Sequence, residues 1–263
     1  HLSIRRQRQM CIRDRSQIKP HIEKRYSAIW QRPVTQMREV IESIKAIFEC
    51  WSEGSELNYQ GEFYKFSLMT PIFVPDSMPW KPPPVWLAAL GPLMTKLAGE
   101  ISDGVLIHPF SSRKFLDEVT IPALKDGANK AVRENKPKLI TNSIVCSYRS
   151  EEEYEKAIKG AKFNLAFYGS TPAYKVTLDV HGWGEMQPVL NRLTKEGRWD
   201  EISSVISDEV LHTLAVVGEP SEVASQLVER FGDVADRVGL SVPYDAPVDP
   251  VSYTHLRAHE TRE

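Results

Sequence analysis

Hydrophobic side chains recur at steps of three and four along residues 33–51, which predicts one amphipathic helix there. Pro33 suits the first turn of that helix, and Gly54 follows its end. The predicted apolar stripe consists of Val34, Met37, Ile41, Ile44, Phe48 and Trp51. The pattern of residues 57–67 then predicts a short hairpin, and the proline-dense stretch 70–84 predicts an irregular connection.

From residue 84 onward, short apolar runs alternate with stretches of helical period. The apolar runs predict four strands, at 84–90, 104–110, 138–148 and 235–244. The helical stretches predict helices within 92–100, 112–135, 150–169, 185–196, 200–207 and 220–232. Unbroken apolarity is typical of parallel strands covered on both faces, so we expect β-α-β units with right-handed crossovers. A (β/α)8 TIM barrel needs eight strands, so the predicted fold is an α/β barrel of this type that lacks its N-terminal strands.

The two ends of the chain lack any hydrophobic period. Residues 1–15 carry five arginines, and residues 251–263 follow a proline-rich exit. Both segments resemble translated sequencing adapters; the alternative is a basic nucleic-acid arm in front and a polar tail behind. We favour the artefactual origin for 1–15 and for 251–263, which leaves 16–250 as the C-terminal part of a barrel.

The charge and cysteine content indicate which binding partners and which cellular compartment to expect. The chain has 33 basic and 35 acidic side chains, and without its two ends the balance is 26 against 32. Such a body has no basic face to neutralise phosphates, so nucleic-acid binding is not expected. No apolar stretch approaches the roughly 20 residues that cross a bilayer, so no membrane partner is expected. Cys11, Cys50 and Cys146 share no metal-ligand spacing, which predicts free buried thiols in a reducing compartment, the cytoplasm.

The chemistry of such barrels lies at the carboxyl ends of the strands. Gly91 and Pro92 stand between a predicted strand and a predicted helix. Gly91 would let the backbone turn, and the free N–H groups of Leu93, Met94 and Thr95 would face the cleft at the positive end of the helix dipole. This arrangement predicts an anion seat, such as one for a cofactor phosphate. A plain Gly-Pro turn explains the pattern equally well.

Other polar residues near strand ends allow two interpretations each. His108 ends the second predicted strand and could exchange a proton near neutral pH, although a lone histidine is more often structural. The segment 181–186, HGWGEM, could form a lid through Trp183, but a loop packed on the barrel rim is the favoured interpretation. A charged patch that either flanks the site or begins a solvated helix consists of Lys19, His21, Glu23 and Arg25.

Signatures of several other enzyme classes are missing. The chain has no G-x-S-x-G, H-E-x-x-H, G-x-x-x-x-G-K-[ST], G-x-G-x-x-G or H-x-H sequence. Its remaining histidines are dispersed, so no metal site is expected. No nucleophile–base pair is evident at the strand ends, so a barrel hydrolase is not favoured.

Several stretches, in their order and spacing, resemble the luciferase-like monooxygenase superfamily, and more narrowly its branch of coenzyme F420-dependent oxidoreductases. They are SQIKPHIEKRYS, the helix that ends in CW, GEFY, PPPVWLAALGP followed by AGEISDG, and VVGEPSEVASQL. The similarity runs from about Ser16 to Tyr244.

This resemblance implies a (β/α)8 barrel of the bacterial luciferase-like type that holds reduced flavin or the deazaflavin F420 at the carboxyl ends of its strands. Carried over by position, Ser16 and Gln17 would lie beside the cofactor. The residues that would hold its ribityl-phosphate side are Ala89, Leu90, Gly91, Pro92, Met94 and Thr95. The family also carries strands and pocket residues ahead of the position of Ser16, where this chain has residues 1–15 instead.

The expected function is therefore that of a flavin- or deazaflavin-dependent oxidoreductase. The leading hypothesis is hydride transfer between coenzyme F420 and a small organic substrate, with His108 as the candidate catalytic residue. One alternative is an FMNH2-dependent monooxygenase that uses dioxygen, and another is an inactive truncated fragment that binds no cofactor. The expected partners are the small-molecule substrate and, optionally, a second copy of the chain in a homodimer.

Overall fold

The computed structural model describes residues 12–14, 18–76, 81–133 and 135–244. These residues divide into two compact units. The first unit contains the described residues up to Leu106 together with Thr120–Lys138, and the second contains Ile107–Val119 together with the described residues from Leu139 onward. Among the described residues we find no helix with the length and apolar character that a bilayer crossing requires.

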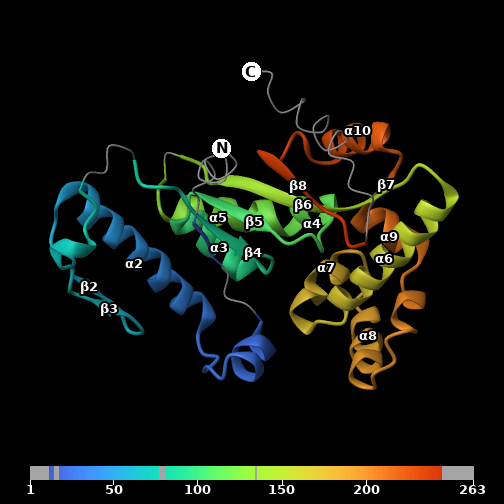
Figure 1. Cartoon of the computed structure of the whole chain (residues 1–263), viewed down its shortest axis with the longest axis horizontal. Helices are drawn as coiled ribbons and strands as arrows, with labels where there is room; N and C mark the ends of the chain where they lie inside the picture. The colour runs from blue at the N-terminus through green and yellow to red at the C-terminus, as the bar shows by residue number, and fades with distance from the viewer. Residues whose placement is uncertain (1–11, 15–17, 77–80, 134, 245–263) are drawn as a thin grey trace. The chain divides into compact units, whose positions relative to one another are not determined.

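The first unit combines short strands with long helices (Figure 1). Strand β4 (Val85–Ala89) lies between β1 (Ile12–Asp14), with which it pairs in parallel, and β5 (Gly104–Ile107). Strands β2 (Tyr59–Gln60) and β3 (Lys65–Phe66) form a separate antiparallel hairpin. The helical elements are η1 (His21–Arg25), α2 (Pro33–Glu53), η2 (Pro71–Phe73), α3 (Pro92–Ile101) and α5 (Ile121–Lys130).

Strand β4 is buried on both faces. Val85, Trp86, Leu87 and Ala89 are buried, and only Ala88 is partly exposed. This burial is what the unbroken apolar run predicts for a strand inside a parallel sheet.

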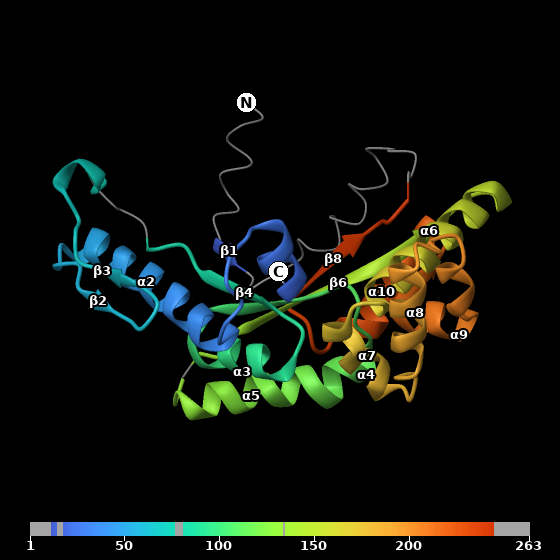
Figure 2. The same cartoon turned by 90° about the horizontal axis from the view of Figure 1, so that it is seen from below.

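Helices α3 and α5 cross at two glycines. A Cβ atom added to Gly99 would lie 2.2 Å from the carbonyl oxygen of Leu124, and one added to Gly127 would lie 2.0 Å from that of Lys96. The two helices lie side by side in both views (Figure 2), and their backbones touch where the side chains are missing. Only glycine fits at either position, so this crossing sets the direction of α3.

A shared carboxylate joins the three long helices of the first unit. Glu100 of α3 accepts hydrogen bonds from Arg38 of α2 at 2.5 Å and from Lys130 of α5 at 2.8 Å. Burial by itself would raise the pKa of Glu100, but the hydrogen bonds from Lys130 and Arg38 hold that pKa below its usual value. The ionised carboxylate therefore braces α3 from both sides.

The β2–β3 hairpin is attached to α2 through a buried carboxylate. Glu39 is 6% exposed, and it accepts hydrogen bonds from the backbone N–H groups of Glu62, Phe63 and Tyr64 at 2.9, 2.7 and 3.0 Å. Burial by itself would raise the pKa of Glu39, but these three donors hold it below its usual value. The GEFY stretch therefore forms a turn that wraps a side chain of the preceding helix.

The second unit is built around strand β6 (Lys138–Ser147). Strand β6 pairs in parallel with β7 (Ala215–Gly218) through residues 144–147 and with β8 (Arg237–Ser241) through residues 140–144. The helical elements are α4 (Arg113–Phe115), η3 (Leu116–Thr120), η4 (Pro172–Tyr174), η5 (Ile202–Val205), α6 (Glu151–Gly169), α7 (Lys175–Val180), α8 (Met186–Lys195), α9 (Asp208–Leu214) and α10 (Pro220–Phe231).

The core of the second unit is one apolar cluster from these strands and helices. Its members include Phe110, Ile144, Leu165, Leu190 and Leu214, and each is no more than 1% exposed. Cys146 lies in the same cluster, and burial raises the pKa of its thiol to about 12. Cys50 and Cys146 are free and buried, as predicted, whereas Cys11 lies outside the described residues.

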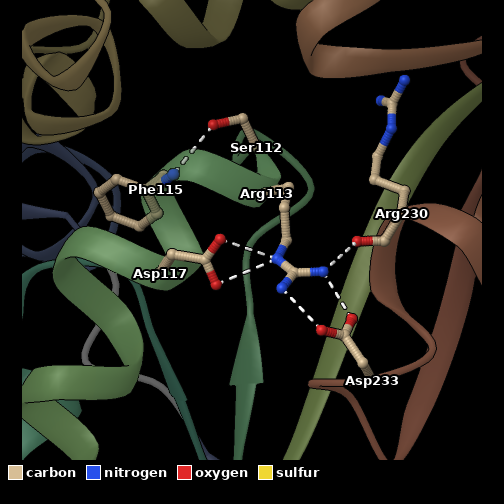
Figure 3. Close-up of polar contacts among 6 residues, drawn as sticks. All are labelled: Ser112, Arg113, Phe115, Asp117, Arg230 and Asp233. Carbon is tan, nitrogen blue, oxygen red and sulfur yellow. Dashed lines mark hydrogen bonds and ion pairs between the residues drawn. The ribbon is translucent and has the colours of Figure 1, made fainter.

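Two arginines tie the helices of the second unit together, and Figure 3 shows the contacts of one of them, Arg113. Arg113 of α4 donates to both carboxylate oxygens of Asp117 at 3.0 and 2.8 Å, and to both of Asp233 at 2.5 and 2.8 Å. It also donates to the backbone carbonyl of Arg230 at 3.0 Å. The Arg230 guanidinium in turn donates to the carbonyls of Ala215 and His212 near the end of α9. These contacts satisfy polar groups that the helix ends leave unpaired.

Most of the predicted elements are present at the predicted places. Helix α2 ends at Gly54, whose φ is +70°, and Ser150 accepts a hydrogen bond from the Glu153 amide at the start of α6. The helical stretch predicted at 112–135 contains the π-helical turn η3, which ends just ahead of Pro122. The chain is an α/β protein with parallel strand pairs and helices.

Strand β7 was not predicted, and neither was helix α9. The strand has four residues and follows α9 with no intervening turn residue. Its apolar residues therefore continue the apolar pattern of the helix, and the boundary between the two elements cannot be seen in the sequence. The missed signal is Ser207, whose hydroxyl caps α9 at the Val210 amide, followed by two acids in the first turn. Strand β1 falls within residues 1–15, which were left out of the predicted fold. It pairs with β4 through backbone hydrogen bonds, which do not depend on the identity of the side chains.

We predict that Gly99→Ala destabilises the chain by about 2 kcal/mol or more, because the new methyl group must push α3 away from the Leu124 carbonyl. Urea unfolding followed by circular dichroism measures the loss. The matched control is Gly91→Ala, where φ is −69° and a Cβ would meet nothing within 4 Å. An equal loss of stability in the two variants would contradict the conclusion that only glycine fits where α3 crosses α5.

We also predict that the Glu39 carboxylate makes stability depend on pH. Its pKa is lower in the folded than in the unfolded chain, so its contribution is complete above about pH 4.3 and is lost as the pH falls through the folded pKa. Glu39→Gln should cost about 1–3 kcal/mol at pH 7 and flatten the loss of stability between pH 5 and 3. Glu49→Gln, on the exposed side of the same helix, is the control. A wild-type slope in the Glu39→Gln variant would refute the assignment.

Candidate functional site

The junction between β4 and α3 is the place where the sequence predicts an anion site. Gly91 follows Leu90 and is the N-cap of α3, with φ −69° and ψ 151°. Any residue adopts this extended backbone, so the turn itself does not require glycine. Instead, a Cβ at Gly91 would project into open space, with no atom within 4 Å. Glycine here leaves room in front of the helix.

The first amides of α3 are divided between the helix and the space before it. The Thr95 amide donates to the Gly91 carbonyl at 3.1 Å, so it is not free, which corrects the expectation for that residue. The Thr95 hydroxyl donates to the same carbonyl at 3.1 Å, and Thr95 is fully buried. Pro92 has no N–H, so the amides of Leu93 and Met94 are the donors left at this end of the described helix.

Helix α3 differs from other helices that follow strands in this chain. The Ser112 hydroxyl caps α4, the Ser150 hydroxyl caps α6, and the Glu222 carboxylate closes the start of α10 on the Glu219 amide. In α3 no side chain of the described residues accepts from the first turn, and that turn contains no acidic residue. The positive end of its dipole therefore has no carboxylate from its own first turn beside it, an arrangement that favours an anion.

The other predicted cofactor residues take different positions. Ala89 and Leu90 are buried, 8% exposed each, so only their backbone could face a ligand. Pro92 is exposed and Met94 is partly exposed on the first turn of α3. Ser16 and Gln17 lie outside the described residues, so their assignment stays a prediction.

His108 follows β5 in the second unit and lies in an aromatic cluster. Its ring centroid is 4.6 Å from that of Tyr168 and 4.6 Å from that of Tyr174. Nδ1 of His108 accepts the Phe110 N–H at 3.1 Å, which assigns a neutral ring with its proton on Nε2. This ring can donate a hydrogen bond in that form, and its catalytic role stays a prediction.

The structure brings together a serine and a histidine that the sequence did not pair. Ser112 Oγ lies 2.7 Å from Nε2 of His181, although 69 residues separate them. Ser112 is 2% exposed and its oxygen already caps α4 at the Phe115 amide, at 3.1 Å (Figure 3). A buried hydroxyl that is engaged in this way holds structure and is not placed to attack a substrate. No local signal in the sequence marks this pair.

The HGWGEM stretch packs on the unit and does not stand away from it. Trp183 stacks on His181, with ring centroids 4.5 Å apart and planes 19° apart. Gly182 has φ +75°, which favours glycine, and the Trp183 amide donates to the Leu178 carbonyl at 2.9 Å. Of the two interpretations given for this segment, a lid or a packed loop, these contacts fit the packed loop.

The charged patch near the start of the described chain is mostly solvated. Residues 21–25 form the single turn η1, and Lys19 and Glu23 lie 3.7 Å apart as an exposed pair. Within the described part of the chain no group of three His, Cys, Asp or Glu side chains could hold a metal ion. A shallow cavity of about 330 Å³ around Cys50, Leu57 and Met69 contains none of the predicted site residues.

A protein-family comparison matches residues 16–237 to the luciferase-like monooxygenase family. The chain belongs to the luciferase-like monooxygenase family. Members of this family are oxidoreductases, and the match covers the β4–α3 junction as well as most of the second unit. The recognition made from sequence stretches is thereby confirmed.

Three proteins are among those similar to this chain in sequence or structure. An uncharacterised protein of Mycobacterium tuberculosis is 40% identical over 224 residues, which cover 85% of this chain and 66% of that protein. The 5,10-methylenetetrahydromethanopterin reductase of Archaeoglobus fulgidus is 28% identical over 233 residues, which cover 86% of this chain and 64% of the reductase.

The third is a solved structure, the coenzyme F420-dependent tetrahydromethanopterin reductase of Methanopyrus kandleri. It matches with a TM-score of 0.65 at 23% identity and covers 88% of this chain and 68% of that one. This likeness shows a luciferase-like, TIM-barrel-type fold. The chain spans about two thirds of the length of the relatives that it matches.

Proposed function

We propose that this chain is part of an F420-dependent oxidoreductase that acts on a small organic substrate. The family match carries the reaction class, and the reductases named above favour the deazaflavin over other cofactors. The observation in the chain itself that supports the proposal is the open, uncapped start of α3 at Gly91. F420 carries phosphate, which is the kind of group that such a helix end binds.

The residues at the start of α3 fit a phosphate group. The Leu93 and Met94 amides would donate to a phosphate oxygen, and the missing side chain at Gly91 would let that oxygen approach. Thr95 holds the first turn in place by returning both its amide and its hydroxyl to the Gly91 carbonyl. When bound, the deazaflavin supplies hydride transfer to or from the substrate. The protein contributes the binding and the orientation.

An FMNH2-dependent monooxygenase is the second candidate, because the matching family is named for monooxygenases. FMN also carries a phosphate, so the same helix end would serve it. The substrate, the cytoplasmic location and a homodimer stay predictions.

We predict that a charge placed at Gly91 separates folding from cofactor binding. Asp is a favoured N-cap, so Gly91→Asp should leave the stability of the chain unchanged or raise it slightly. The same carboxylate would repel a phosphate at this helix end, so the F420 dissociation constant should rise at least tenfold. Gly91→Asn has nearly the same size and capping ability without the charge, and it should bind closer to wild type. Fluorescence titration with F420 and with FMN measures the affinities.

Three outcomes would count against parts of this proposal. An unchanged F420 affinity in the Gly91→Asp variant would refute the hypothesis that the start of α3 binds the cofactor phosphate. Tight FMN binding without F420 affinity would favour the monooxygenase. A folded chain that binds neither cofactor would support the inactive fragment instead.

A further inference from the structure

Helix α7 is held on the segment that follows β5 by side chains one turn apart. Thr177 donates its hydroxyl proton to the Phe110 carbonyl at 3.0 Å, and His181 hydrogen-bonds to the Ser112 hydroxyl at 2.7 Å. Leu178 is 1% exposed and belongs to the core of the second unit. Thr177 and Leu178 therefore anchor α7 itself, whereas His181 anchors the turn of residues 181–185 that follows.

The hydrogen-bonding capacity of Ser112 shows which form of His181 fits. Oγ of Ser112 accepts the Phe115 N–H at 3.1 Å, so its own proton needs an acceptor inside a buried site. Nε2 of a neutral His181 ring is that acceptor. A protonated ring would donate instead, and the Ser112 proton would lose its partner. The neutral ring therefore satisfies every group at this contact.

The surrounding charges also favour the neutral ring. Burial lowers the pKa of His181, and Lys114 of α4 lowers it further. Glu118 of η3 and Glu209 of α9 act in the opposite direction but do not offset the other two effects. On α7 itself, Lys175 and Asp179 are paired with each other. Protonation of His181 thus works against burial and against a neighbouring cation.

We infer that His181 is a titratable clasp: its neutral ring, bonded to the Ser112 hydroxyl, holds the 181–185 turn on the segment after β5, and protonation of the ring loosens that turn. The clasp is complete above about pH 6.5, the usual pKa of histidine, and is lost as the pH falls through the lower pKa of the folded protein. The inference does not depend on the cofactor.

Trp183 reports the protonation state directly, because its indole stacks on the His181 ring and an imidazolium quenches indole fluorescence more strongly than imidazole does. The signal is the fluorescence of the whole chain minus that of Trp183→Phe, measured from pH 8 to 4.5. We expect one transition with its midpoint below 6.5, which His181→Asn abolishes. A midpoint at or above 6.5 would overturn the inference.

Ser112→Asp tests the contact while His181 is retained. Asp still caps α4, and its carboxylate would favour the imidazolium, so the midpoint should rise by more than one pH unit. An unchanged midpoint would mean that residue 112 and the ring do not interact, and would overturn the inference.

Hydrogen exchange followed by mass spectrometry tests the loosening. At pH 7, His181→Asn should speed exchange in the peptide of residues 181–186 at least threefold and leave residues 175–180 unchanged. The matched control is Thr177→Val, which removes the other polar contact of α7 but no titratable group, and it should leave the fluorescence midpoint unchanged. If His181→Asn does not alter exchange at 181–186, the turn is held by other contacts and the clasp is refuted.

Discussion

The contact of α3 with α5 through two glycines is the constraint on which the first unit depends. At Gly99 and Gly127 a carbonyl oxygen of the opposite helix occupies the place where a side chain would stand. Because each glycine lets the backbone of the other helix approach closely, this contact constrains the axis of α3. The Glu100 carboxylate then ties that helix to both α2 and α5. The direction of the α3 N-terminus, and so of its free amides, follows from this packing.

The function proposed for this chain rests on what is left open at the end of that rigid element. Nothing in the backbone conformation or the packing at Gly91 calls for glycine, and no side chain of the described residues caps the helix. A braced helix with an uncapped start is a preorganised site for an anion, since no bond has to break before one binds. Membership of a family of oxidoreductases supports the proposal that this anion is the phosphate of a ring cofactor.

The second unit differs from the first, because it contains several short helices and many helix ends that need hydrogen-bond partners. Arg113, Arg230 and the serine caps satisfy those ends, while an apolar cluster around Phe110 and Leu165 fills the interior. The Ser112–His181 contact is part of the same pattern, in which one hydroxyl serves a helix end and a distant ring. A titratable group in such a contact gives a structural bond a dependence on pH.

The sequence by itself determined the class of fold, the places of the long helices and most strands, and the family. These follow from local period, from capping residues and from the order of short stretches, all of which are read along the chain. It could not show that the Thr95 amide is used by the Gly91 carbonyl, that β7 follows α9 without a turn, or that the backbone angles at Gly91 do not require glycine. Only the tertiary structure joined Ser112 to His181, 69 residues away, because hydrogen bonds between distant segments depend on packing, which has no period in the sequence.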